Sequence, residues 1–69
     1  MAQYCVNKNG QSNGDHEVHN LATCTVLPNS DNRLALGEHV TCRTAVTKAK
    51  EIYSQSNGCA TCSPSCHTT

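Results

Sequence analysis

Apolar and polar residues alternate with a period of two in three short stretches of the chain. The three stretches are residues 3–8, 16–21 and 33–38. Tyr4 and Val6 share one face of the first stretch, and Leu34 and Leu36 share one face of the third. Because alternate residues of a β-strand point to the same side, the pattern predicts three short strands, each with one half-buried face.

The segments between these strands carry turn residues. Two Asn-Gly pairs, Asn9-Gly10 and Asn13-Gly14, separate the first two stretches. Asn and Gly are the residues that best tolerate positive φ, so residues 3–21 are predicted to form a hairpin with a long loop. Residues 22–32 are predicted to be a second loop, because they contain the run Pro28-Asn29-Ser30-Asp31-Asn32.

A change to helical periodicity marks residues 42–53. The apolar stripe of this segment consists of Cys42, Ala45, Val46, Ala49, Ile52 and Tyr53. Thr41 is placed to cap the helix at its N-terminus, and Lys48 and Lys50 lie in its C-terminal half, where positive charge favours the helix dipole. We predict one main helix over 42–53.

Two further turn signals follow the helix. Asn57-Gly58 is predicted to end the helix with a left-handed turn, and Ser63-Pro64 to begin a short C-terminal helix. The predicted fold is therefore a single small α+β domain over residues 1–69. It consists of a three-stranded antiparallel sheet and one main helix.

The composition indicates that this domain needs a cross-link. Leu, Ile and Val number ten among 69 residues, and the chain has no Phe or Trp. A core of this size is small for a chain that folds alone. The six Cys and four His leave three classes open: a disordered chain, a disulfide scaffold and a metal-nucleated domain.

The charge of the chain bears on its partners, and the lack of a targeting or membrane-spanning segment bears on its compartment. The formal net charge is zero and no block of like charge is present, which argues against nucleic acid and anionic membranes as partners. The first residues lack the basic start and apolar run of a signal peptide, and no apolar stretch is long enough to span a membrane. We therefore expect a cytoplasmic protein, whereas a mature secreted fragment with an added Met would reverse that expectation.

The Cys and His spacing predicts a zinc site. Cys59 and Cys62 form a Cys-x-x-Cys pair after Gly58, and this spacing lets both sulfurs point at one metal ion. His19 and Cys24 offer a second pair where the second strand runs into a loop. A zinc ion held by these four residues would tie the hairpin to the end of the chain and replace the missing core.

Other assignments stay open at this point. Cys66 and His67 are reserve candidates for the fourth ligand. Cys5 and Cys42 are predicted to be buried thiols, although a Cys42–Cys66 bridge is one of 15 ways to pair six cysteines. The remaining histidines, His16 and His39, are predicted to be solvated.

Two catalytic interpretations are weaker. A redox Cys-x-x-Cys opens a helix within a βαβ unit, whereas this pair follows the main helix. Hydrolytic zinc needs an open coordination position and a general base. Glu17 and Glu38 are the nearby carboxylates, but no His-Glu-x-x-His motif occurs.

The stretch 19–64 resembles the metal-binding domain of the Ada DNA-repair protein and its relatives appended to bacterial nucleases. In that family an upstream pair of ligands joins a downstream Cys-x-x-Cys followed by Pro, around a small α+β fold. The resemblance implies zinc ligation by His19, Cys24, Cys59 and Cys62, and Pro64 matches the family's proline. The whole chain is also similar to a family of small bacterial Cys/His-rich proteins.

Two departures from the Ada pattern bear on function. The basic residues that meet DNA in that family are absent, since Ala60 and Thr61 separate the two cysteines. His19 replaces the Cys that would accept a methyl group. We therefore expect a monomeric, non-catalytic zinc module that acts as an accessory or interaction protein. The alternatives are a disulfide-stabilised secreted or effector peptide, and a thiol redox or zinc-thiolate alkyl-acceptor protein.

Overall fold

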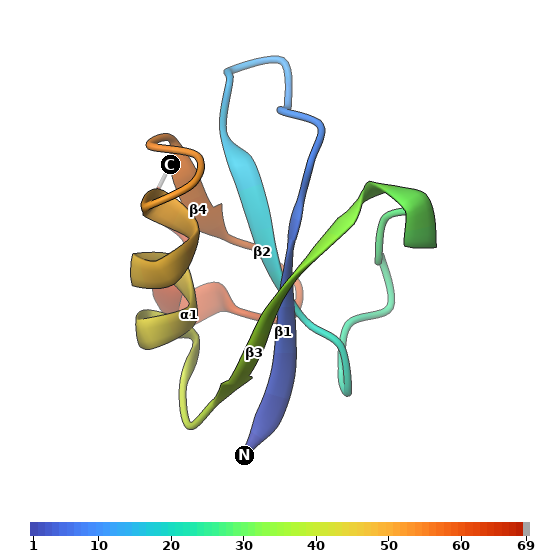
Figure 1. Cartoon of the computed structure of the whole chain (residues 1–69), viewed down its shortest axis with the longest axis vertical. Helices are drawn as coiled ribbons and strands as arrows, with labels where there is room; N and C mark the ends of the chain where they lie inside the picture. The colour runs from blue at the N-terminus through green and yellow to red at the C-terminus, as the bar shows by residue number, and fades with distance from the viewer. Residues whose placement is uncertain (69) are drawn as a thin grey trace.

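A computed structural model describes residues 1–68 of the chain, and in it four strands form one mixed sheet. The strands are β1 (Ala2–Asn7), β2 (His16–Asn20), β3 (Arg33–His39) and β4 (Ser56–Gly58). The helices are α1 (Cys42–Lys50) and two short 3-10 turns, η1 (Ser30–Asn32) and η2 (Pro64–Cys66). Their order in the sheet is β3-β1-β2-β4 (Figure 1). The α+β class is confirmed, as are the three predicted strands and the short C-terminal helix.

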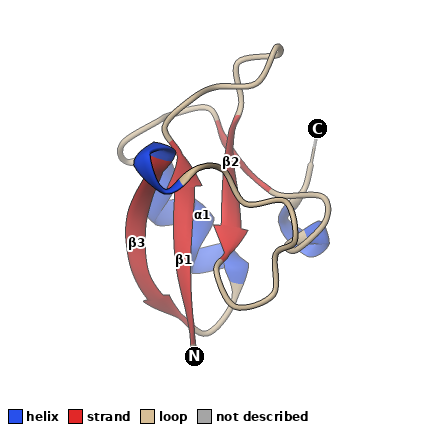
Figure 2. Cartoon of the chain, turned by 90° about the vertical axis from the view of Figure 1, so that its right-hand side faces the viewer, coloured by secondary structure: helices blue, strands red, loops and turns tan. Residues whose placement is uncertain are grey.

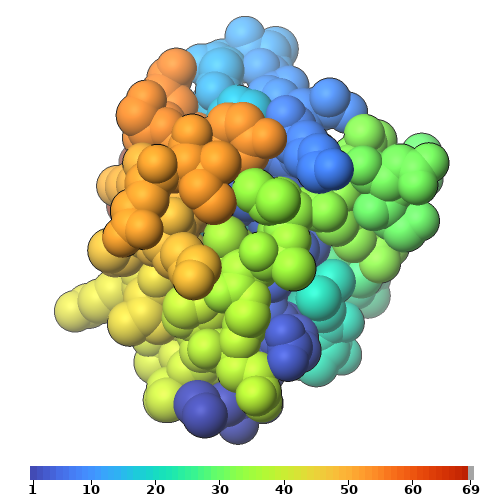
Figure 3. Space-filling model, in the orientation of Figure 1, coloured from blue at the N-terminus to red at the C-terminus, as the bar shows by residue number. Residues whose placement is uncertain are grey.

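The predicted hairpin is present. β1 pairs antiparallel with β2, placing Val6 opposite Val18, and it pairs antiparallel with β3 on its other side. Of the two Asn-Gly pairs in the connecting loop, the second supplies the positive φ, because Gly14 has a φ of 90°. β1 is therefore an inner strand, and residues of β3 cover most of it in the space-filling view (Figure 3).

The prediction of a purely antiparallel, three-stranded sheet was wrong, because β4 pairs parallel with β2. Ser56, Asn57 and Gly58 have low β propensity and no apolar alternation, so local pattern could not identify them as a strand. Their pairing depends on β2, where Val18 lies opposite Gly58.

The prediction that Asn57-Gly58 ends the helix was also wrong. α1 stops at Lys50, where the backbone N–H of Glu51 bonds to the carbonyl oxygens of Lys48 and Ala49. Gly58 lies in β4 and does not have positive φ; within residues 1–68 the positive-φ residues are Gly14 and Gly37. The predicted N-cap residue, Thr41, precedes α1 but makes no side-chain capping hydrogen bond.

One face of the sheet packs against α1, as Figure 2 shows with the helix behind the strands. The buried core contains Tyr4, Val6, Val18, Leu36, Cys42, Ala45 and Ala49. The predicted helical stripe is thus correct over the first two turns. It fails at Ile52, which is 50% exposed, because the helix ends before that residue.

A second buried layer lies on the other side of β1 and β2. Cys5 and His19 are opposite each other across the two strands, and each is only 1% exposed. They alternate with the core residues Val6 and Val18, so they belong to the sheet face that α1 does not cover. The prediction that Cys5 is buried is confirmed, and its position leads to the candidate site.

A disulfide bond joins Cys42, at the start of α1, to Cys66 in η2. Cys42 is buried, as predicted, but it is not a free thiol. The bond connects the helix to the C-terminal segment, and it removes Cys66 as a reserve ligand because its sulfur is already bonded.

Candidate metal centre

Four side chains meet on the sheet face away from α1. The ligand atoms of His19, Cys24, Cys59 and Cys62 all lie within 4.8 Å of one another. His19 comes from β2, Cys24 from the loop after β2, and the Cys-x-x-Cys pair from the segment after β4. These are the four residues predicted from spacing, and they are close enough to hold one metal ion.

The parallel β2–β4 pairing brings the two halves of the site together. β4 ends beside Val18, and the backbone N–H of Cys59 donates to the carbonyl oxygen of Val18 over 2.9 Å. The next residue of β2 is His19, so this hydrogen bond places Cys59 beside the imidazole. The N–H of Ser63 then bonds to the carbonyl oxygen of Cys59 over 2.8 Å, which folds the Cys-x-x-Cys segment into a turn.

The distances fit tetrahedral coordination. Cys24 Sγ lies 3.9 Å from Cys59 Sγ, and His19 Nδ1 lies 3.4 Å from Cys24 Sγ and 3.9 Å from Cys62 Sγ. A tetrahedral zinc ion with ordinary bond lengths requires S–S separations of about 3.8 Å and N–S separations of about 3.5 Å. A disulfide requires sulfurs only about 2.05 Å apart. The four residues are therefore spaced as metal ligands and not as a bonded cysteine pair.

Hydrogen-bond donors surround one of the sulfurs. The backbone N–H of Asn20 donates to Cys62 Sγ over 3.3 Å, and the hydroxyl of Ser63 contacts the same sulfur at 3.9 Å. Donors directed at a sulfur favour its thiolate form, which is the form that binds a metal.

His19 has one nitrogen facing the sulfurs and one facing away. Its Nε2 is buried and has no hydrogen-bond partner among residues 1–68. The nearest carboxylate oxygen is Glu17 Oε1, at 3.9 Å. If Nδ1 is a metal ligand, Nε2 must carry the proton, and Glu17 is then the outer partner that metal-bound imidazoles normally have.

The titration properties of the cluster describe its metal-free state. Burial, together with the neighbouring Cys62 and Cys59 thiols, raises the pKa of Cys24 to about 12. Burial lowers the pKa of His19, and the Glu17 carboxylate partly opposes this shift. The cluster therefore holds a neutral imidazole and a protonated Cys24 thiol in the absence of a cation. A divalent ion reverses the preference at the sulfurs, since coordination deprotonates a thiol.

Cys5 lies next to the cluster without belonging to it. Burial raises the pKa of the Cys5 thiol, and the Arg33 charge only partly opposes this shift. Cys5 therefore remains an uncharged interior side chain beside the site.

The other reserve ligand, His67, lies outside the four-residue group. Its Nδ1 is 3.0 Å from the carbonyl oxygen of Gly58. The ring therefore holds the C-terminal segment against β4.

His16 and His39, which were predicted to be solvated, are half-buried and make specific contacts. His16 stacks on Tyr53 with ring centres 4.0 Å apart, and its Nδ1 is 2.9 Å from the carbonyl oxygen of Asn7. His39 bridges the oxygen atoms of Leu36 and Thr44. His39 also packs edge-on against Tyr4 of β1, with ring centres 5.9 Å apart. Each ring thus has a contact with a segment that is distant in sequence, which period-two patterning could not reveal.

Glu17 is the site residue whose role sequence reasoning missed. The sequence identified its carboxylate as a nearby base but not as an outer partner of His19. A signal was present, because residues two apart on a strand point to the same side.

No protein family, curated protein or solved structure matches the chain, so comparison with known proteins does not assign it to a family. The resemblance to the Ada domain therefore stays a prediction. Within residues 1–68, no helix has the length and apolar character needed to cross a membrane.

Proposed function

We propose that the protein is a small structural zinc module in which His19, Cys24, Cys59 and Cys62 hold one zinc ion. The observation that carries the proposal is the convergence of one imidazole and three sulfurs within 4.8 Å. Three sulfurs and one nitrogen in tetrahedral spacing form a donor set that zinc prefers.

The donor count supports a structural and not a catalytic metal. A catalytic zinc keeps one coordination position open for water or substrate, whereas four protein donors fill a tetrahedral site. The ion would join β2 and its following loop to the segment after β4. Such a cross-link supplies the stability that a core with few large apolar residues lacks.

Metal analysis tests this proposal directly. Protein produced with zinc available should contain one zinc per chain by native mass spectrometry, and chelation should lower its melting temperature. Cys24→Ser should lose the metal, whereas Cys5→Ser should retain it because Cys5 is outside the ligand group. A folded, metal-free protein that takes up no zinc would overturn the proposal.

We further propose that the module is a monomer with an accessory or interaction role rather than an enzyme. Its neutral net charge favours a protein partner over nucleic acid. Sedimentation of the zinc-loaded protein tests the monomeric state.

The Cys42–Cys66 bond favours a second candidate, a disulfide-stabilised domain of an oxidising compartment. The cytoplasmic location was expected because the first residues lack the features of a signal peptide, and this bond weakens that expectation, since disulfides are rare in a reducing compartment. The two candidates differ in what unfolds them. A chelator should unfold a zinc module even while its disulfide is intact, whereas a reductant alone should unfold a disulfide scaffold. In intact cells, alkylation of Cys42 and Cys66 would show free thiols and thus a reducing compartment, whereas protection from alkylation would show that the disulfide is formed.

A further inference from the structure

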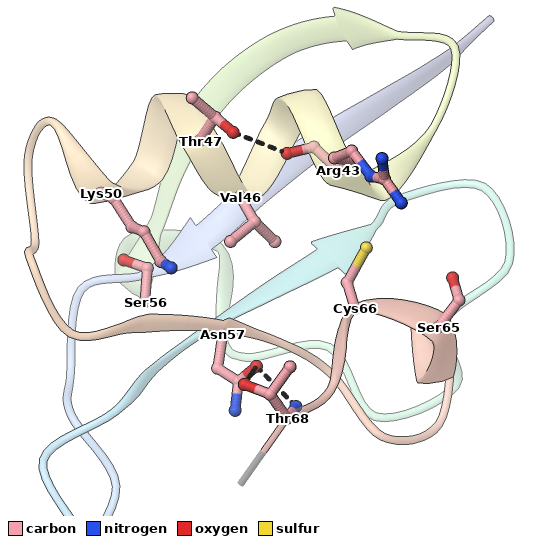
Figure 4. A pocket seen from close by; sticks show the side chains of 9 residues that line it. All are labelled: Arg43, Val46, Thr47, Lys50, Ser56, Asn57, Ser65, Cys66 and Thr68. Atoms are coloured by element: carbon pink, nitrogen blue, oxygen red, sulfur yellow. Dashed lines mark hydrogen bonds between the residues drawn. The ribbon is translucent and has the colours of Figure 1, made fainter.

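A cavity of about 240 Å³ lies between α1 and the chain that follows it, away from the metal ligands (Figure 4). The helix contributes Arg43, Val46, Thr47 and Lys50, which recur at the spacing of one helix face. β4 contributes Ser56 and Asn57, and the C-terminal segment contributes Ser65, Cys66 and Thr68. Ser56 and Asn57 are both more than nine-tenths buried, so the cavity has a polar floor.

Among the described residues 1–68, the charged side chains that line this cavity are both positive. Arg43 and Lys50 line it, no Asp or Glu does, and neither cation forms an ion pair within residues 1–68. The chain as a whole has no net charge. Two unpaired cations around one cavity therefore form a local excess that an anion would neutralise.

Three hydroxyl donors of the cavity are already used. The hydroxyls of Thr47, Ser56 and Thr68 donate to Arg43 O at 3.0 Å, Tyr53 O at 2.6 Å and Asn57 Oδ1 at 3.2 Å. The guanidinium of Arg43 and the ammonium of Lys50 thus remain as the charged donors of the cavity.

The two cations lie at opposite ends. Figure 4 shows Lys50 beside Ser56 at one end, Arg43 near Cys66 at the other, and the apolar side chain of Val46 between them. Seven helical positions separate Arg43 from Lys50, which corresponds to roughly 10 Å along the helix axis. With the two side chains at opposite ends of the cavity, one small anionic group would lie beside one cation, whereas two groups joined by a short apolar spacer can lie beside both.

We propose that this cavity binds a small α,ω-dicarboxylate, with one carboxylate at Arg43, the other at Lys50 and the spacer against Val46. The volume is below the roughly 300–1,000 Å³ of pockets that hold drug-sized molecules, so the ligand is the size of a simple metabolite. This binding does not depend on the metal centre, since none of His19, Cys24, Cys59 and Cys62 lines the cavity.

The test is an NMR titration of the intact protein with adipate, and with hexanoate as the monocarboxylate of equal chain length. Adipate should shift the amide signals of α1 and β4 saturably, and hexanoate should bind at least about threefold more weakly. Arg43→Gln and Lys50→Gln should each weaken adipate binding about three- to fivefold, the upper part of the range of an exposed ion pair. Lys48→Gln removes the same charge from the same helix but does not line the cavity, so it should leave binding unchanged.

Three results would overturn the proposal. They are non-saturating shifts with adipate, equal binding of adipate and hexanoate, and an equal effect of Lys48→Gln and Lys50→Gln. Because all three variants are at exposed positions, they should fold as the parent protein does, which the unperturbed signals of β1 would verify.

Discussion

Oε1 of Glu17 lies 3.9 Å from Nε2 of His19, a buried nitrogen with no hydrogen-bond partner within residues 1–68. The two residues are separated by one position on β2 and point to the same side of the strand. A small movement of the carboxylate would complete a hydrogen bond to the imidazole N–H when Nδ1 binds a metal. Glu17 can therefore orient the imidazole of His19, and this orientation affects the affinity of the site for a metal ion.

Glu17→Gln should lower zinc affinity about tenfold, because a neutral amide orients and polarises the imidazole less well than a carboxylate. Competition with a chromophoric chelator measures the change. Glu38→Gln is the matched control, since Glu38 is an exposed carboxylate on β3. Equal affinities for the two variants would contradict a role for Glu17 at His19.

The metal-free protein should lose stability as the pH falls through about 6.5, the ordinary pKa of histidine. Burial lowers the pKa of His19 in the folded state, so the unfolded chain takes up this proton first. Acidification then favours unfolding until the pH falls below the lowered pKa, where the effect levels off. At higher pH the imidazole is neutral in both states and the full stability is present.

Urea unfolding in the presence of chelator, with the disulfide intact, measures this pH dependence between about pH 7.5 and pH 5.5. His19→Gln should flatten the slope, because it removes the imidazole whose pKa burial lowers. A slope that survives in His19→Gln would assign the effect to another group.

Breaking the Cys42–Cys66 bond should destabilise the protein by about 3 kcal/mol, since the bond closes a loop with a sequence separation of 24. Metal release to a chelator should also become faster. The reason is that the bond anchors η2, and the N–H of Cys66 bonds to Ser63, next to the ligand Cys62.

The single variants Cys42→Ser and Cys66→Ser and the double variant should lose nearly the same stability, because each removes the same bond. Denaturant unfolding measures the three values. Additive losses would show that the two sulfurs act independently and that the bond does not form.

Gly58→Ala should be destabilising by about 2 kcal/mol or more, because there is no room for a side chain. An added Cβ would lie 2.6 Å from Cys66 Cβ and 2.8 Å from the carbonyl oxygen of Ser63. The strain falls between β4 and η2, next to Cys59, so zinc affinity should fall as well.

Gly37→Ala is the informative comparison for this variant. Nothing lies within 4 Å of an added Cβ at Gly37, but its φ of +83° disfavours a side chain. It should cost about 1 kcal/mol through backbone strain and leave zinc affinity unchanged. The same loss of affinity in both variants would contradict a local effect at Cys59.

The sequence alone determined the elements whose signals are local. Alternation located β1, β2 and β3, helical spacing located α1, and Ser63-Pro64 located η2. Spacing also selected the four residues that the structure brings together, since a Cys-x-x-Cys turn directs two sulfurs at one point regardless of the surrounding fold.

Only the tertiary structure decided what depends on contacts between distant segments. β4 exists because Ser56–Gly58 lie beside β2, and the partner of Cys42 depends on where η2 packs. The contact of His16 with Tyr53, and the cavity that α1 forms with β4 and the C-terminal segment, likewise join segments that no local pattern relates. In a chain with few large apolar residues, such long-range pairings do much to specify the fold. Periodicity along the sequence reflects local structure and therefore does not predict them.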